Sequence, residues 1–553
     1  MDSDKQKLNH ELELLNLKDI PKGKKINFFV GMLIVIGSSI GAGIFFKSHE
    51  ILHYNSLSLI LAILSWSIAS IAIILLAIGL LEVVKSTNGN LSYVGWNKKF
   101  NTRVVYQMSR NFTLYLNIPL TFFFMPLYAL MSFQDGLQAF GINKTFGTNV
   151  DWLIWGIIVV LISIYFLVSS GLSAKVANIQ NSITLFLKVL AIICSVVIAL
   201  AYYIINRKSV QEDIHWLPVA PQMDHEEMNF SYKMMPGIGL FLSWAGIFFA
   251  YDGFYVSTGI ENEMKKPKDA PKVLLWGLGI VTLIHLIIAV AMSINGKGDF
   301  KEFFKFLNQR NLGWIFGIVN IFIGIGVLGI INGFSLWIPR FIEELIKNEE
   351  IVFASKLKDK LVQNKPKIGV IYSIFLIIPI VIIFIIIGGL FYPNKFENIQ
   401  DAQDLISYAS YGSGMSSLYN LADLLSNWLS LIIFGFIAMA CFGYFLKNFK
   451  RKYKSKSQRI LLWINFIISI FIMIVLFINF LSVFIDLILL MQQQEHLDHS
   501  CCSSAFIEQL KDQINGKILL IIVFFVFSFI IFVPPLVRLI NYKKMFKRSV
   551  SIK

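Results

Sequence analysis

The sequence predicts an all-α membrane protein that crosses the bilayer many times. Hydrophobic residues make up 56% of its 553 residues, and the mean hydropathy is +0.67. Charged residues account for only 15%, against about 25% in ordinary soluble domains. The apolar residues come in continuous runs instead of at an amphipathic spacing, which indicates segments buried on all sides in lipid or in a helix bundle.

Twelve of these runs are long enough to cross a bilayer, because a helix needs about 20 apolar residues to span roughly 30 Å of hydrocarbon. Eleven contain no Asp, Glu, Lys or Arg, and the fifth is interrupted only by Lys188. The predicted spans are 27–46, 57–81, 111–134, 152–174, 176–205, 234–251, 273–296, 311–339, 368–394, 424–446, 460–485 and 518–537.

The net charge of +15 follows the predicted membrane topology and does not indicate a nucleic-acid partner. Lys and Arg collect in both tails and in the loops between spans 2/3, 6/7, 8/9 and 10/11, whereas the loop between spans 5 and 6 is acidic. The positive-inside rule places the basic loops in the cytoplasm. We therefore expect a multi-pass cell-membrane protein with both termini cytoplasmic.

Nothing in the sequence indicates an enzyme, a cofactor or a metal centre. It contains no His-Glu-x-x-His pair and no Gly-Lys-Ser or Gly-Lys-Thr phosphate loop. The loop that holds His496, Asp498, His499, Cys501 and Cys502 could bind a soft metal, but one short loop without a second half is better explained as a solvated segment.

Spans 1 and 6 are interrupted in a way that favours a solute-binding site. Residues 37–45 read Gly-Ser-Ser-Ile-Gly-Ala-Gly-Ile-Phe, and residues 248–259 carry Asp252, Gly253 and Gly259. The glycines of span 1 would also suit close helix packing. An Asp at the bilayer centre, however, costs roughly 2.5 to 3.5 kcal/mol and normally faces a partner or a watery cavity. Interruptions five helices apart are typical of an inverted repeat with its substrate site where the two breaks meet.

The predicted organisation follows from this repeat. Residues 1–26 form a cytoplasmic tail, 27–206 the first five-helix repeat, 234–446 the second, 460–540 helices 11 and 12, and 541–553 a cytoplasmic tail. The fold class is an all-α membrane protein of twelve transmembrane helices, in a five-plus-five inverted repeat with broken helices 1 and 6 and two extra C-terminal helices.

The motif at 37–45 resembles the first-helix signature of the amino acid, polyamine and organocation (APC) transporter superfamily. Residues 249–254 (Phe-Ala-Tyr-Asp-Gly-Phe) and 261–267 (Glu-Asn-Glu-Met-Lys-Lys-Pro) are similar to its sixth helix and the following loop, as found in the L-type and bacterial serine/threonine exchanger branch. Phe254 stands where many of those relatives have Trp. The resemblance implies a LeuT-type fold and a secondary active amino-acid permease or antiporter that works by alternating access.

The expected substrate site combines both breaks. Amides near Ser38, Ser39, Gly41, Ala42 and Gly43 would hold the α-carboxylate, carbonyls around Phe249, Ala250 and Asp252 would meet the α-ammonium, and Phe254, Asn117, Phe123, Asn332 and Ser335 would select the side chain. For Asp252 two interpretations stand with equal weight: it favours a cationic substrate, or it caps the freed amides of helix 6.

Lys188 is expected to couple transport, since a lysine roughly 20 Å beyond Lys175 along the helix is too deep to snorkel to the interface. In relatives that share the motif, a helix 5 lysine takes the place of a bound sodium ion. The resemblance therefore implies sodium-independent transport, with Gly37 and Ser335 as partners of Lys188. The ammonium could release a proton during the cycle or stay charged as a fixed strut. His285, a lone histidine in span 7, is expected to be an ordinary core residue.

The alternatives are a polyamine or other organic-amine transporter, a non-transporting amino-acid sensor, and a channel of the same fold. Expected partners are an amino-acid substrate and the lipid bilayer. Protons, a counter-transported amino acid and a second copy of the chain stay open as further partners.

Overall fold

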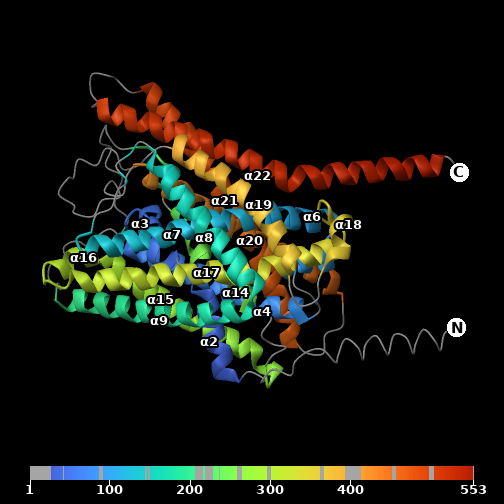
Figure 1. Cartoon of the computed structure of the whole chain (residues 1–553), viewed down its shortest axis with the longest axis horizontal. Helices are drawn as coiled ribbons and strands as arrows, with labels where there is room; N and C mark the ends of the chain where they lie inside the picture. The colour runs from blue at the N-terminus through green and yellow to red at the C-terminus, as the bar shows by residue number, and fades with distance from the viewer. Residues whose placement is uncertain are drawn as a thin grey trace.

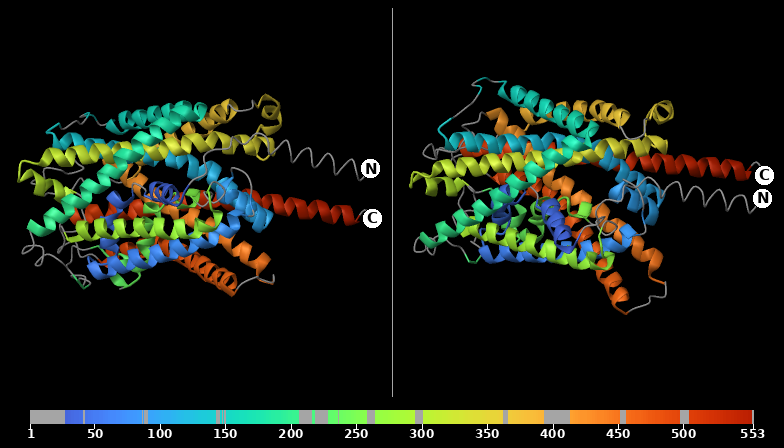
Figure 2. Two further views of the ribbon diagram at one scale, coloured as in Figure 1. Left: turned by 90° about the horizontal axis from the view of Figure 1, so that it is seen from below. Right: turned by 60° about the horizontal axis from the view of Figure 1, so that its bottom comes forward.

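The structure is a computed structural model that describes residues 27–40, 43–85, 87, 91–142, 146, 148, 150–205, 216–217, 228–235, 237–257, 264–294, 301–361, 366–392, 413–450, 456–496 and 504–551. Within these ranges the chain forms a bundle of long helices (Figures 1 and 2). Ten of the described helices are long and apolar enough to cross a membrane. The predicted all-helical membrane fold is therefore confirmed, while the count of twelve spans stays a prediction.

The long helices, in chain order, are α4 (Leu59–Lys85), α6 (Arg103–Phe112) continued by η1 (Thr113–Asn117) and α7 (Ile118–Ala139), α8 (Asp151–Leu172), α9 (Ala174–Ile205), α15 (Ala270–Ile294), α17 (Gly313–Lys347), α19 (Lys367–Leu390), α20 (Ser413–Asn448), α21 (Lys456–His496) and α22 (Ser504–Ser551). Short connecting helices are α5 (Ser92–Phe100), α11 (Ser231–Met234), η3 (Pro267–Asp269), α16 (Lys301–Asn308), α18 (Ala354–Leu357) and η4 (Lys358–Lys360).

The first and sixth predicted spans are the ones that the structure breaks. Span 1 consists of α2 (Phe28–Ser39) and α3 (Gly43–Tyr54). Span 6 consists of α12 (Gly239–Leu242), α13 (Trp244–Ala250) and α14 (Phe254–Ser257). Both interruptions fall where the sequence places glycines at mid-membrane, as expected from the low helix propensity of glycine.

Spans 1 to 4 pack against their counterparts five spans later. α4 contacts α15, α7 contacts α17, and α8 contacts α19. The broken spans follow the same rule, because α3 contacts α13 and α2 contacts α14. This pairing is what an inverted repeat produces when its two halves are related by a pseudo-two-fold axis.

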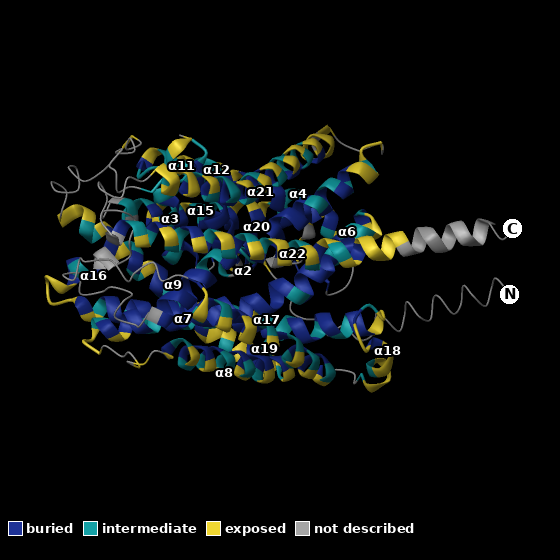
Figure 3. Ribbon diagram, turned by 90° about the horizontal axis from the view of Figure 1, so that it is seen from above, coloured by how far each residue is buried: buried dark blue, intermediate teal, exposed yellow. Residues whose placement is uncertain are grey.

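Glycines let the central helices approach closely, which is the usual source of helix association in lipid. Along α17, a Cβ added at Gly324 would lie 2.7 Å from the Phe133 ring on α7, and one added at Gly326 would lie 3.1 Å from the Lys188 Cβ on α9. α7 and α20 are the most deeply buried of the long helices, whereas α21 and α22 lie at the periphery with exposed apolar side chains (Figure 3). The centre of the bundle is therefore a rigid support for the two broken spans.

Candidate functional site

The two broken spans meet backbone to backbone. A Cβ added at Gly43, the first residue of α3, would lie 2.7 Å from both the Cα and the N of Ala250, the last residue of α13. Real Cβ atoms essentially never come that close to backbone atoms, so only glycine fits at position 43. After Ala250 the chain turns through Gly253, whose φ of 102° lies in the region that glycine occupies without strain.

This contact brings opposite helix ends together. The first amides of α3 lack partners within their own helix and form the positive end of its dipole, and the last carbonyls of α13 form a negative end. One of these carbonyls, that of Phe249, accepts a hydrogen bond from the Asp252 amide at 3.2 Å. The junction therefore presents positive and negative backbone groups side by side, an arrangement complementary to a zwitterion.

The predicted residues of span 1 lie at or just before this junction. Ser39, the last residue of α2, is fully buried, and its hydroxyl has no hydrogen-bond partner in the described part of the chain. Gly37 lies against Leu185 of α9, since an added Cβ would be 2.9 Å from its side chain. Gly41 and Ala42 lie outside the described residues, and Ser38 is described only as part of the backbone of α2.

Tyr251 fixes the break of span 6 to two neighbouring helices. Its hydroxyl is 2.7 Å from the hydroxyl of Ser70 on α4 and donates to Thr282 on α15 at 2.8 Å. Its ring also meets the buried ring of His285 edge-on, at 4.6 Å between centroids. Neither ring nitrogen of His285 has a hydrogen-bond partner in the described part of the chain. The sequence predicted an ordinary core histidine. The ring is buried as predicted, but its nitrogens lack the hydrogen bonds that such a residue would make.

A polar cluster follows the break of span 6. Tyr255 donates to the Asp252 carboxylate, one oxygen of which is buried and makes no hydrogen bond within the described chain. The Tyr255 ring meets Tyr93 of α5 edge-on at 6.0 Å. The Tyr93 hydroxyl in turn accepts from Thr113 at 2.7 Å and Asn117 at 3.3 Å, which are the two ends of η1.

The segment η1 is a single π-helical turn within a long membrane helix, a feature frequently found at functional sites. It places Asn117, one of the predicted side-chain-selecting residues, in the polar cluster that contains Asp252. The sequence alone did not indicate this turn.

Aromatic side chains enclose the other side of the junction. Phe249 stacks on Tyr128 of α7 at 5.5 Å and meets Phe124 edge-on at 5.9 Å. Phe254 is fully buried and packs on Phe434 of α20 at 5.2 Å between ring centroids. Phe123 is also fully buried, but its ring contact is with Phe384 of α19 at 6.1 Å, so the described contacts place it against α19 and not against the broken spans.

Lys188 lies on the face of α9 that meets α17. Its stem packs against Gly326, and it lies within electrostatic range of His285. Leu185, one turn earlier on α9, contacts Gly37, so α9 touches both α2 and α17 close to the lysine. Ser335, further along α17, is fully buried, and its hydroxyl has no partner in the described chain.

Asn332 connects three helices instead of facing an open space. Its amide nitrogen donates to the Ala177 carbonyl of α9 at 2.8 Å, and its amide oxygen accepts from Ser170 of α8 at 2.5 Å. Both ends of the amide are thus used within the protein, which indicates a structural role at the junction of α8, α9 and α17.

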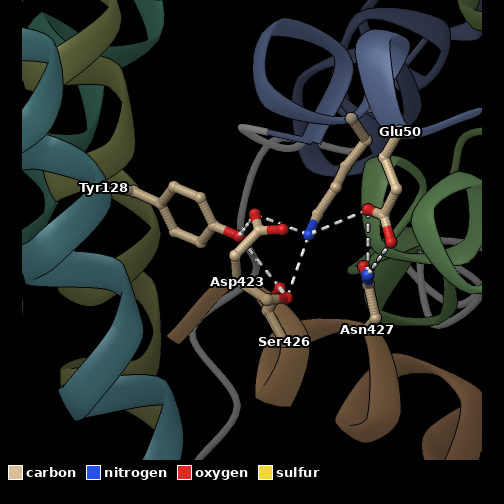
Figure 4. Close-up of polar contacts among 6 residues, drawn as sticks. Glu50, Tyr128, Asp423, Ser426 and Asn427 are labelled. Atoms are coloured by element: carbon tan, nitrogen blue, oxygen red, sulfur yellow. Dashed lines mark hydrogen bonds and ion pairs between the residues drawn. The ribbon is translucent and has the colours of Figure 1, made fainter. Parts of the chain in front are cut away.

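A buried ionic network that the sequence did not predict lies one turn beyond Gly43. Lys47 of α3 has a fully buried side chain, and its ammonium contacts Asp423 Oδ1 at 2.7 Å and Glu50 at 3.5 Å. Figure 4 shows Tyr128 and Asn427 on either side of this group, where Tyr128 donates to Asp423 at 2.7 Å and Asn427 donates to Glu50 at 2.9 Å. The network joins α3, α7 and α20.

Lys47 also connects this network to the junction of the broken spans. Its ammonium lies 5.3 Å from the centre of the Phe249 ring, within the range of cation–π attraction. Its stem lies against Gly246 of α13, where an added Cβ would be 3.3 Å away. The network therefore covers the junction on the α3 side.

Comparisons with known proteins agree with this geometry. The family described as amino acid permease matches residues 26–488. The chain belongs to that family. An uncharacterized protein of Mycoplasma pneumoniae is 39% identical over 546 residues, which cover 94% of this chain and 95% of the relative.

More distant relatives of this permease have described activities. The serine/threonine exchanger SteT of Bacillus subtilis is 24% identical over 346 residues, covering 60% of this chain and 70% of the exchanger. The branched-chain amino acid permease BcaP of the same organism is 25% identical over 171 residues, covering 30% of this chain and 31% of that permease. Among solved structures, MhsT in complex with L-phenylalanine aligns with a TM-score of 0.46 and 14% identity, covering 81% of this chain and 98% of MhsT.

Replacing Lys47 by Met is expected to destabilise this permease, because it leaves the Asp423 carboxylate without its ion-pair partner in a partly buried site. The double variant Lys47→Met with Asp423→Asn should recover part of the loss, with a coupling of roughly 1–3 kcal/mol between the two positions. A double-mutant cycle of thermal unfolding in detergent measures this coupling. Strictly additive effects would show that the two residues do not depend on each other.

Proposed function

We propose that the protein is a secondary active transporter that moves amino acids by alternating access, with its substrate site at the junction of α3 and α13. The observation that carries this proposal is the approach of Gly43 to Ala250, which puts a positive and a negative helix end side by side. The permease family and the activities of its described relatives support an amino-acid substrate.

The proposed recognition of the substrate divides between its two charges. The carboxylate accepts hydrogen bonds from amides of the first break, which includes Ser39, Gly41, Ala42 and Gly43, as half-helix ends do for anionic groups at broken helices. The ammonium lies against carbonyls at the end of α13, around Phe249 and Ala250. A zwitterion satisfies both ends at once, whereas an amine without a carboxylate leaves the amides of α3 uncompensated.

The substrate side chain then projects toward the polar cluster and the aromatic residues around the junction. Asn117 supplies a polar contact in this proposal, and Phe254 supplies an apolar one. Because Tyr255 donates to Asp252, this carboxylate has a partner in the absence of a cationic substrate. That contact favours the first of two roles for Asp252: it orders the break of span 6, and it does not select cationic side chains.

The network around Lys47 has a proposed role in closing one side of the pathway. Alternating access requires that the site opens to one side of the membrane at a time. Lys47, Asp423 and Tyr128 join α3, α7 and α20 directly beside the junction, so separation of α3 from α20 has to break their contacts. We propose that these contacts hold this side closed in the conformation described here.

Uptake by the purified protein in liposomes tests the proposed function. A panel of labelled amino acids is offered with and without a proton gradient, sodium or internal amino acid, and at least one amino acid is expected to accumulate inside. Stimulation by internal amino acid would assign exchange. Transport of polyamines with no amino-acid uptake would contradict the proposed substrate class, and absence of uptake despite saturable binding would indicate a sensor.

Gly43→Leu is expected to abolish both binding and uptake of that amino acid, because even the first carbon of the new side chain collides with the backbone of Ala250. Gly279→Ala is a matched control on α15, since a Cβ added there meets nothing within 4 Å. Equilibrium binding of labelled substrate to the detergent-purified variants is the measurement, alongside their thermal stability. A folded Gly43→Leu protein that binds as the wild type does would exclude this site.

Lys188→Ala is expected to lose most transport, and transport by the wild type is expected to need no sodium. The ammonium of Lys188 is proposed to act as a fixed charge between α2, α9 and α17, with Gly37 as its expected partner on α2. Ser335, the other expected partner, lies about 13 Å along α17 by helical rise from the glycine that Lys188 packs on, beside Gly171 of α8. Lys188→Met keeps the stem that packs on Gly326 but removes the charge, so it separates a packing defect from a charge defect. Near-normal uptake by Lys188→Met, or strict sodium dependence of the wild type, would contradict this role.

A further inference from the structure

A cavity of about 1180 Å³ lies between α6, α19 and α22, away from the broken spans. Its described lining comes from these three helices, from η1, from Lys98 of α5 and from residues 348–352 after α17. No described residue of α2, α3, α13 or α14 contributes to it. The cavity is therefore separate from the proposed substrate site.

One end of the cavity carries an excess of positive charge. Arg103, Arg110 and Arg538 line it, and the charges of Arg103 and Arg538 act on Arg110. The two acidic residues in the lining are already paired, because Glu350 contacts Lys98 at 2.9 Å and also accepts from Tyr106, and Glu349 contacts Lys358 at 3.0 Å.

Arg110 is the residue that most clearly requires a ligand. Its residue exposure is only 5%, its Nε has no hydrogen-bond partner in the described chain, and the one hydrogen bond found for its guanidinium goes to Asn111 at 3.1 Å. A buried guanidinium without an anion is costly, because the hydrogen bond to Asn111 and the Tyr106 ring at 6.0 Å replace only part of the lost water. Arginine also suits phosphate, which its planar fork binds through paired hydrogen bonds.

The remainder of the cavity is an apolar surface along two membrane-spanning helices. It is lined by Ile380, Ile383, Phe384 and Ile387 of α19 and by Leu519, Ile522, Val523, Val526, Phe529 and Ile530 of α22. Ile383, Ile522, Val526 and Phe529 are exposed on the outside of the protein. A small soluble anion would leave this surface uncovered, whereas an acyl chain would cover it.

We propose that this cavity binds an anionic membrane phospholipid, with its phosphate at Arg110, Arg103 and Arg538 and its acyl chains along α19 and α22. Basic pockets between membrane helices bind anionic lipid head groups in this way. The site lies at the start of the continuous helix that carries η1 and Asn117, so the bound lipid also stabilises the position of that helix. This inference does not depend on the proposed transport activity.

Native mass spectrometry of the full-length protein in detergent tests the proposal with phosphatidylglycerol and phosphatidylcholine as probes. Phosphatidylglycerol is expected to bind at least about tenfold more tightly, because each arginine contributes roughly fivefold to the affinity for an anionic lipid. The double variant Arg103→Ala with Arg538→Ala should lose most of this preference, since only Arg110 remains to bind the phosphate. Both arginines are exposed, so the variant is expected to fold.

Two further variants separate the head-group contacts from other effects. Val526→Trp is expected to weaken phosphatidylglycerol binding by filling the apolar surface. The double variant Lys175→Ala with Lys272→Ala is the charge control. It removes two exposed cations that do not line the cavity, so it should leave phosphatidylglycerol binding unchanged. Equal binding of both lipids by the wild type, or unchanged binding by the arginine variant, would overturn the proposal. Displacement of the lipid by equimolar glycerol phosphate would do so as well, because it would identify a site for a soluble anion.

Discussion

The close approach of Gly43 to Ala250 is the constraint on which the rest of the structure depends. Two helix ends meet within a membrane only if their unpaired amides and carbonyls find partners, since each unsatisfied backbone group in hydrocarbon costs several kcal/mol. Tyr251 fixes one end to α4 and α15, and the packing of spans 1 to 4 against their counterparts five spans later holds the bundle around both. The junction is thus a pre-arranged set of opposite partial charges beside aromatic side chains, and we propose that a zwitterionic substrate completes it.

The charged groups within the bundle have distinct surroundings, and these surroundings suggest distinct roles. Lys47 and Asp423 neutralise each other between α3 and α20, where a relative movement of the helices would separate them. Lys188 lies instead against a glycine of α17, on a surface where close packing leaves its helix little freedom. Arg110 faces neither the junction nor an acidic residue, and its environment opens toward the outer surface of α19 and α22. These separate surroundings are the basis of the three proposed roles, which are pathway closure for Lys47, coupling for Lys188 and lipid contact for Arg110.

Much of the architecture was predictable from the sequence, because hydrophobic runs and mid-membrane glycines are local signals. The interruptions at residues 37–45 and 248–259 predicted both breaks, and their spacing predicted the paired halves. What the sequence missed lies at the edges of the predicted spans. Because a span was defined by the absence of charge, span 1 ended at Phe46, span 3 began at Asn111 and span 10 began at Leu424, each one residue away from Lys47, Arg110 and Asp423. Such residues look like loop charges until the fold shows a partner 376 positions away. The hydrogen bonds of Asn332 likewise join it to residues of two other helices that are far away in the sequence, so the sequence alone could not reveal them.

Hydrogen exchange of the purified protein, with and without the amino acid that it binds, tests the central claim most directly. If the substrate lies between the two helix ends, its binding should slow exchange in two peptides that are far apart in sequence, one covering residues 37–46 and the other 248–255, and both effects should saturate at the same substrate concentration. Protection in only one of these peptides, or protection confined to α6, α19 and α22, would contradict a site built from the junction of the broken helices.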